Sequence, residues 1–184
     1  MQKRNGDYAT KIIVAPGDKP GSHPYGTKTV TNASDMMFPL NWKTASTDSL
    51  AMQYDYGIIR LPSAFSGNPA TLTLNANYST TNYTNLSAGM LGYDYATAKL
   101  WEHRGRISYA NSSLVYTKLD TLPGMSGCPI VDSNNTVVGI NCYGISGNYT
   151  WEEIITPVED NHPDYNKGPR ITSAVKAFLE QNGN

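Results

Sequence analysis

Short apolar runs, each interrupted by Gly, Asn, Ser or Pro, make up most of this 184-residue chain. Runs rich in Val, Ile, Leu, Tyr and Thr with such interruptions are typical of strands joined by turns. A clear case is CPIVDSNNTVVGINC at residues 128–142, where residues 133–135 form a predicted turn between two apolar strands. The pattern therefore predicts an all-β fold, built as a barrel or a sandwich.

The C-terminal end departs from this pattern. In ITSAVKAFLEQNG the apolar residues recur at helical spacing, and a glycine that can stop a helix follows them: Ile171, Val175, Phe178, Leu179 and Gly183. We therefore predict a C-terminal helix that packs its apolar side on the neighbouring strands.

A candidate nucleophile lies in GMSGCPIV at residues 124–131, where Ser126 stands between glycines just before a predicted apolar strand. Acyl transfer needs an exposed hydroxyl with N–H donors close by for the developing oxyanion, and small neighbours permit both. The amides of Gly124 and Ser126 are the candidate donors. The alternative interpretation is a plain Gly/Ser turn that enters a strand.

A candidate acid partner lies earlier, in QYDYGIIRL at residues 53–61, where Asp55 precedes a short apolar strand. The order Asp then Ser matches chymotrypsin-fold proteases, whereas α/β-hydrolases place the serine first within GxSxG. Cys128 stands where that second motif needs glycine.

These stretches resemble the trypsin-like serine proteases, specifically the bacterial glutamyl endopeptidases, and the resemblance extends to YATKIIVAPG at residues 8–17 and to the C-terminal end. It implies a two-lobed antiparallel β-barrel fold of the chymotrypsin type. Residues 1–75 would form the remainder of the N-terminal barrel, and residues 76–184 the second barrel with the nucleophile loop and the helix. The implied activity is peptide-bond hydrolysis through an acyl-enzyme on Ser126.

In this family a TAGHC-like sequence with the catalytic histidine precedes the stretch that resembles residues 8–17. This chain contains no such sequence. We therefore expect an incomplete N-terminal barrel, and a missing N-terminal segment that supplies the general base. The alternative is a pseudoprotease that binds peptides without cutting them.

The histidines of this chain do not fit the role of the base. His23 and His162 stand in turn-rich polar loops, and His103 stands among charged residues of a predicted strand. None follows the expected chain order of histidine before Asp55. An esterase of the α/β-hydrolase type could use His162, but Cys128 replaces the second glycine of its GxSxG nucleophile motif.

The resemblance also indicates the residues that contact substrate. Thr121 and Asn141 lie five before and fifteen after the nucleophile, at positions that line the primary pocket; Asn141 replaces a histidine, so we expect a weakened preference for acidic residues. Asp120 matches the position that gives trypsin-type enzymes a basic preference, and otherwise reads as a turn residue. Tyr143 and Gly144 would line the edge where a peptide adds as a strand.

The two cysteines, Cys128 and Cys142, stand at the ends of the predicted hairpin. A disulfide between them would close a loop of about 15 residues and contribute about 3 kcal/mol of stability. The alternative is two separate small thiols. The resemblance favours a secreted protein, with the export signal in the missing segment.

The net charge of −1 and the 16% of charged residues argue against a nucleic-acid or membrane-surface binder, whose footprint is a basic patch or stripe, and no polybasic run appears in the sequence. No apolar stretch approaches the roughly 20 residues that cross a bilayer. We expect a polypeptide substrate, and neither a cofactor nor a metal.

Overall fold

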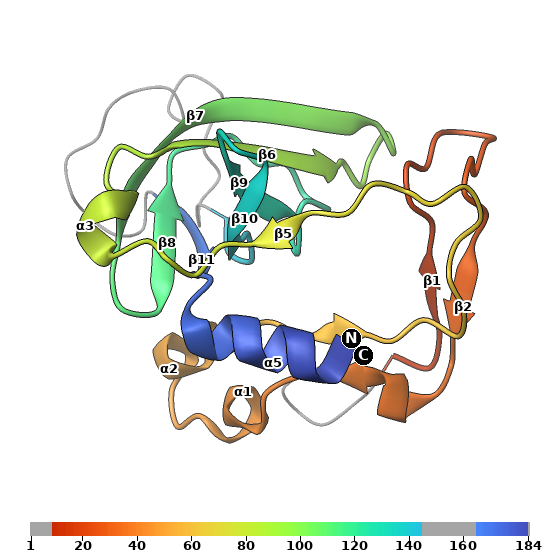
Figure 1. The fold of residues 1–184 in the computed structure, drawn as a ribbon, viewed down its shortest axis with the longest axis horizontal. Helices are drawn as coiled ribbons and strands as arrows, with labels where there is room; N and C mark the ends of the chain where they lie inside the picture. The colour runs from red at the N-terminus through yellow and green to blue at the C-terminus, as the bar shows by residue number, and fades with distance from the viewer. Residues whose placement is uncertain (1–8, 145–164, 184) are drawn as a thin grey trace.

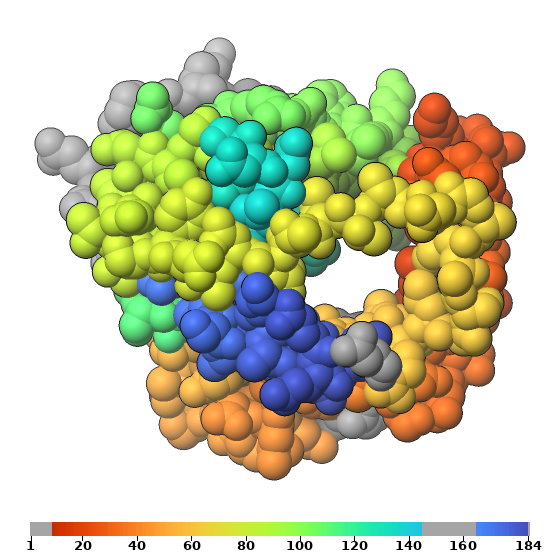
Figure 2. Space-filling view, viewed as in Figure 1, coloured from red at the N-terminus to blue at the C-terminus, as the bar shows by residue number. Residues whose placement is uncertain are grey.

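The structure is a computed structural model and describes residues 9–144 and 165–183. A curled seven-stranded sheet and a smaller group of strands and short helices face each other, and the C-terminal helix α5 lies along one side (Figure 1). Figure 2 shows an opening between the two groups. The arrangement is mostly β, as the sequence predicts.

The first lobe consists of two small antiparallel sheets, one of β1 (Ile12–Val14) with β2 (Lys28–Val30) and one of β3 (Met36–Met37) with β4 (Ile58–Ile59). Between β2 and β4 lie η1 (Ala33–Asp35), α1 (Leu40–Thr44) and α2 (Asp48–Met52). Only Val30, Met36 and Ala51 are buried hydrophobic residues in the described part of this lobe. The described first lobe therefore encloses very little apolar core of its own.

The short helices have local causes that the strand pattern does not reveal. α2 begins after Thr47, whose Oγ1 accepts a hydrogen bond from the Leu50 amide at 3.2 Å. α3 (Thr80–Tyr83) begins after Ser79, whose Oγ accepts from the Asn82 amide at 3.3 Å. Such caps satisfy backbone donors that the first turn of a helix leaves unpaired. The sequence prediction of a single helix missed these elements.

The second lobe is the seven-stranded sheet. In spatial order its strands are β11 (Asn166–Pro169), β8 (Leu114–Thr117), β7 (Leu100–Ala110), β6 (Ser87–Tyr93), β9 (Pro129–Asp132), β10 (Thr136–Ile140) and β5 (Thr73–Leu74). Neighbouring strands are antiparallel except for β5, which runs parallel to β10. β5 stands before the predicted lobe boundary at residue 75 and yet pairs within this sheet.

The sheet curls until its ends meet. Bridges join Gly139 to Arg170 and Tyr143 to Lys167, so β10 and the residues after it contact β11. The strands approach so closely here that a Cβ atom at Gly168 would overlap the carbonyl oxygen of Ile140. Only glycine permits this closure.

The barrel interior is a contiguous apolar cluster that includes Tyr83. The cluster contains the fully buried Met90, Ile107, Val115, Ile130 and Val138. Tyr83 is itself buried and donates its phenol proton to the Val138 carbonyl at 2.8 Å. Burial raises the pKa of Tyr83 to about 12.

The predicted hairpin at residues 128–142 is confirmed as β9 and β10. Its turn is held by Asp132, whose carboxylate accepts from the amides of Asn134 and Thr136, from Thr136 Oγ1 and from Tyr78 Oη. Burial alone would raise the pKa of Asp132, but these hydrogen bonds outweigh it and the pKa is lowered. The hairpin is therefore fixed by a buried, fully bonded carboxylate.

The predicted C-terminal helix is confirmed as α5 (Ser173–Gly183). Val175 packs with Val137 and Ile171 of the second lobe, and Phe178 meets the ring of Tyr56 edge to face at 5.4 Å. α5 thus connects the two lobes. No helix in the described ranges is both long enough and apolar enough to span a membrane.

We predict that Tyr83→Phe lowers the free energy of unfolding by about 1 kcal/mol, because it removes one buried hydrogen bond and leaves the ring in place. Urea denaturation followed by circular dichroism measures the change. Tyr95→Phe is the control, since Tyr95 is highly exposed; its effect should stay within about 0.5 kcal/mol. Equal effects of the two changes would contradict the described packing of Tyr83.

Candidate active site

The loop that carries Ser126 is anchored from the barrel core. Met125 and Cys128 are buried members of the core cluster, whereas Ser126 and Gly127 between them are exposed. The Met125 amide donates to the Leu122 carbonyl at 3.0 Å, and the Cys128 amide donates to the Met125 carbonyl at 3.2 Å. The apolar side chains therefore hold the loop while the serine stays at the surface.

Two glycines allow this shape, for different reasons. Gly124 has φ +106°, and a Cβ there would lie 2.6 Å from the Tyr95 nitrogen and 2.9 Å from the Tyr93 oxygen. Gly127 has φ +87°, with nothing near enough to contact a Cβ. Both backbone conformations disfavour other residues, and at Gly124 close packing excludes a side chain as well.

The amides of this loop differ in their hydrogen bonding. Those of Met125, Gly127 and Cys128 all donate to backbone carbonyls. Among the described residues, the amides of Gly124 and Ser126 donate to no acceptor. Two donors without partners thus belong to the loop that exposes the Ser126 hydroxyl, as an oxyanion site requires.

Asn141 supports the nucleophile loop through three hydrogen bonds. Its carbonyl accepts from the Gly127 amide at 2.6 Å, its amide donates to the Cys128 carbonyl at 2.9 Å, and its Nδ2 donates to the Met125 carbonyl at 3.2 Å. The residue is only 3% exposed, and its Oδ1 is buried without a partner among the described residues. The structure places Asn141 beneath the loop as a support, and its amide nitrogen is already engaged.

Asp55 is held by Cys142 and Tyr143, the two residues that follow Asn141. Tyr143 Oη donates to Asp55 Oδ2 at 2.6 Å, and Cys142 Sγ lies 3.2 Å from the Asp55 carbonyl. On its other side, the neighbouring Tyr56 packs on α5. Residues 141–143 therefore bind the Ser126 loop at one end and Asp55 at the other, which brings the two predicted residues to one region.

Tyr143 contributes to this site through its side chain. Its backbone amide donates to the Lys167 carbonyl at 2.9 Å, and its carbonyl accepts from the Lys167 amide at 2.8 Å. Because both groups are engaged with β11, the backbone of Tyr143 is not available to pair with an added peptide strand. Of the two residues expected at that edge, Gly144 is the one that remains a candidate.

Thr121 lies beside Gly144 and is hydrogen-bonded to Asn166, a residue that the sequence analysis did not identify. Thr121 Oγ1 donates to Asn166 Oδ1 at 3.1 Å, and Asn166 Nδ2 donates to the Leu119 carbonyl at 2.6 Å. A Cβ at Gly144 would lie 3.6 Å from Asn166 Oδ1 and 3.9 Å from Thr121 Oγ1. No sequence motif marks Asn166, because closure of the barrel brings it here from 45 residues away.

Asp120 is engaged with His103. The Asp120 amide donates to His103 Nδ1 at 2.5 Å, and an Asp120 carboxylate oxygen lies 3.2 Å from the same nitrogen. A ring nitrogen that accepts from N–H carries no proton, so this geometry corresponds to the Nε2–H tautomer. The carboxylate of Asp120 therefore lies against an imidazole.

The histidines do not complete a triad within the described residues. His23 Nδ1 lies 2.5 Å from Asp18 Oδ1 on the exposed connection between β1 and β2, and His103 is bonded to Asp120. His162 lies outside the described residues. Both described histidines are thus paired with aspartates other than Asp55.

Cys128 and Cys142 are free thiols, so the candidate disulfide is not formed. The hydrogen bond between Asn141 and Cys128 places those two residues opposite each other, and Cys142 is the next residue, whose side chain turns to Asp55. Burial raises the pKa of Cys128 to about 11, and burial with the charge of Asp55 raises the pKa of Cys142. Neither thiol is a nucleophile at neutral pH.

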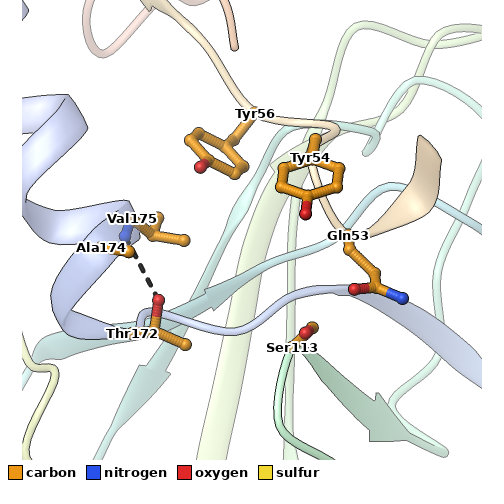
Figure 3. Close-up of a pocket in the computed structure, with 7 residues that line it drawn as sticks. All are labelled: Gln53, Tyr54, Tyr56, Ser113, Thr172, Ala174 and Val175. Atoms are coloured by element: carbon orange, nitrogen blue, oxygen red, sulfur yellow. Dashed lines mark hydrogen bonds between the residues drawn. The ribbon is translucent and has the colours of Figure 1, made fainter. Parts of the chain in front are cut away.

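A cavity of about 200 Å³ lies between the Asp55 segment and the start of α5 (Figure 3). Its lining comes from the loop after α2, from the β7–β8 turn, and from the start of α5 with the residue just before it: Gln53, Tyr54, Tyr56, Ser113, Thr172, Ala174 and Val175. None of these is a predicted catalytic or substrate-binding residue. The cavity therefore lies beside the residues that flank Asp55 and is distinct from the Ser126 loop.

Known proteins resemble this chain in sequence and in fold. No protein-family profile matches the chain. It is 27% identical over 173 residues to a glutamyl endopeptidase of Bacillus licheniformis, covering 93% of this chain and 50% of the relative. It is 30% identical over 178 residues to a Bacillus subtilis protein named extracellular metalloprotease, covering 91% and 48%. The chain thus spans about half the length of these relatives.

Two solved structures share the fold. A Glu endopeptidase in complex with MPD matches with TM-score 0.76 and 21% identity, covering 96% of this chain and 74% of that one. The protease Anisep from Arthrobacter nicotinovorans matches with TM-score 0.70 and 19% identity, covering 97% and 77%. The fold is therefore that of the chymotrypsin-type proteases. The resemblance to the bacterial glutamyl endopeptidases is confirmed by the sequence relatives.

The name of the Bacillus subtilis relative raises the question of a metal. Within the described ranges, no three His, Cys, Asp or Glu side chains are grouped so that they could hold a metal ion. We therefore assign no metal ligands among the residues that the structure describes.

We predict that Gly124→Ala destabilises the protein more than Gly127→Ala. Either change forces alanine to a positive φ, at a cost of about 1–2 kcal/mol. Gly124→Ala also introduces overlap with the backbone of residues 93–95 and should cost about 3 kcal/mol or more. Urea denaturation of the two variants gives the difference. A Gly127→Ala variant less stable than Gly124→Ala would contradict the described loop.

Proposed function

We propose that this chain is the core of a serine endopeptidase that hydrolyses peptide bonds through an acyl-enzyme on Ser126. The observation that carries the proposal is the single segment, residues 141–143, that bonds to both the Ser126 loop and Asp55. The protease relatives support the reaction class. The substrate is a polypeptide, and the relative named extracellular supports a secreted protein.

In this mechanism Ser126 Oγ attacks the substrate carbonyl carbon, and the carbonyl oxygen becomes an oxyanion bonded to the amides of Gly124 and Ser126. Their lack of other acceptors in the described structure supports this role. A histidine removes the hydroxyl proton as Ser126 attacks, then returns a proton to the leaving amine. Asp55 orients that histidine, while Tyr143 occupies its Oδ2.

We attribute the general base to a histidine outside this chain, in a segment that completes the first lobe. Two observations support this: both described histidines are paired with other aspartates, and the described first lobe buries few apolar residues. Without a base, the serine hydroxyl is a weak nucleophile. The isolated chain would then bind peptides and scarcely cleave them, which is also the behaviour of the alternative, a peptide-binding pseudoprotease.

We predict that the 184-residue chain cleaves a mixed peptide library at a rate lower by on the order of 10⁴-fold or more than a version extended by its own upstream coding sequence. Ser126→Ala in the extended version should abolish the difference. Asp55→Asn there should lower kcat by about 10⁴-fold, since the histidine would lose its orientation.

Mass spectrometry of the digests measures all four rates. Comparable turnover by the short and extended proteins would place the base within this chain. An extended protein that stays inactive would favour the peptide-binding alternative.

A further inference from the structure

The hydrogen bonds around Thr121 bear on which substrate side chain the protein accepts. This inference rests on the proposed function, in which Thr121 and Gly144 lie beside the substrate residue that precedes the cleaved bond. Two side chains, those of Thr121 and Asn166, lie next to Gly144. Which of their atoms donate and which accept decides what hydrogen bonds this pair can offer to a ligand.

The orientation of the Asn166 amide is fixed by the backbone. One of its terminal atoms lies 2.6 Å from the Leu119 carbonyl oxygen. A carbonyl oxygen cannot donate, so the atom that faces it must be the nitrogen. The other atom, Oδ1, therefore faces Thr121.

The proton of Thr121 follows from this orientation. Oδ1 of Asn166 accepts only, and it lies 3.1 Å from Thr121 Oγ1. The hydroxyl must therefore donate its single proton to Asn166, which leaves the oxygen lone pairs of Thr121 for a ligand.

A glutamate side chain suits these groups poorly. An ionised carboxylate offers only acceptors, and it would meet the lone pairs of Thr121 Oγ1. A glutamine has the same length and offers two N–H donors. The expected acidic preference depended on donors at Thr121 and Asn141, and in the structure both have their donors engaged elsewhere.

A basic residue would need a carboxylate in the pocket. Asp120 is the candidate, but its carboxylate lies 3.2 Å from the His103 ring and its amide donates to that ring. Its side chain is not among the atoms within 4 Å of a Cβ at Gly144, which come from Asn166 and Thr121. A neutral donor fits the pocket better than a cation does.

We propose that the Thr121–Asn166 pair makes this protein select a neutral amide side chain, with glutamine best, before the cleaved bond. Asn166 is the residue that determines the preference, because it takes the Thr121 proton. It does so from β11, without belonging to the nucleophile loop.

The test uses the 184-residue chain and four fluorescent peptides that differ only in their C-terminal residue: Gln, Glu, Arg or Leu. Each mimics the product whose last side chain occupies the pocket, so binding requires no general base. Fluorescence anisotropy at pH 8, where glutamate is ionised, gives the dissociation constants. We expect the Gln peptide to bind about fivefold more tightly than the Glu peptide, the effect of about one hydrogen bond.

Two variants test the residues named. Thr121→Val removes the acceptor and should bring the Gln and Leu peptides to equal affinity, whereas Thr71→Val, at an exposed threonine, should leave the fivefold ratio unchanged. Asn166→Ala frees the Thr121 proton and should shift the preference from Gln towards Glu. Circular dichroism establishes that each variant is folded.

Tightest binding of the Glu peptide by the unaltered chain would overturn the inference and leave the proposed function standing. Tightest binding of the Arg peptide would do the same and would assign the pocket charge to Asp120. If none of the four peptides binds, both this inference and the proposed function fail.

Discussion

The pairing of residues 142–143 with Lys167 is the constraint on which the candidate site depends. The amides of Cys142 and Tyr143 both donate to the Lys167 carbonyl, and the Lys167 amide donates to Tyr143. This pairing closes the barrel and fixes the direction of the Tyr143 side chain. A shift by one residue would turn each side chain to the opposite face, and the phenol would then leave Asp55. The neighbouring Gly168 makes the closure sterically possible.

The two halves of the site differ in how they are held. The Ser126 loop is anchored by Met125 and Cys128 in the barrel core, and burial of a side chain of the size of Met contributes about 1.5–3 kcal/mol. In the described part of the first lobe only Val30, Met36 and Ala51 are buried hydrophobic residues, so Asp55 has no comparable core beneath it there. Its position depends on Tyr143 in front and on the packing of Tyr56 against α5. The geometry of Asp55 is therefore largely a property of the second lobe.

Local signals in the sequence predicted the elements that local physics determines. The hairpin at 128–142 and the helix at the C-terminal end follow from turn residues and apolar spacing, and both are confirmed. The short helices were missed because four or five residues give too little periodicity, although Thr47 and Ser79 are recognisable caps. The order of Asp55 and Ser126 indicated two candidate residues, and the segment 141–143 bonds to Asp55 and to the loop of Ser126.

The long-range contacts of the site could not be predicted in this way. The parallel pairing of β5 with β10 and the contact of Thr121 with Asn166 join residues far apart in sequence. Asn141 illustrates the difficulty: its position after the nucleophile suggested a pocket residue, whereas its side chain supports the loop. Spacing along the chain gives a residue's place on a strand, but hydrogen-bond partners decide what its polar atoms do.

The stability of the loop and the polarity of the pocket are consequently coupled. Asn141 donates its Nδ2 to the Met125 carbonyl, and Asn166 donates its Nδ2 to the Leu119 carbonyl. Both bonds hold the stretch that leads to Ser126, and both leave an Oδ1 acceptor on the other side of the amide. Replacing either asparagine to introduce a donor would remove a buried hydrogen bond from that stretch. Through Asn166, the backbone of that stretch thus fixes the direction of the Thr121 proton.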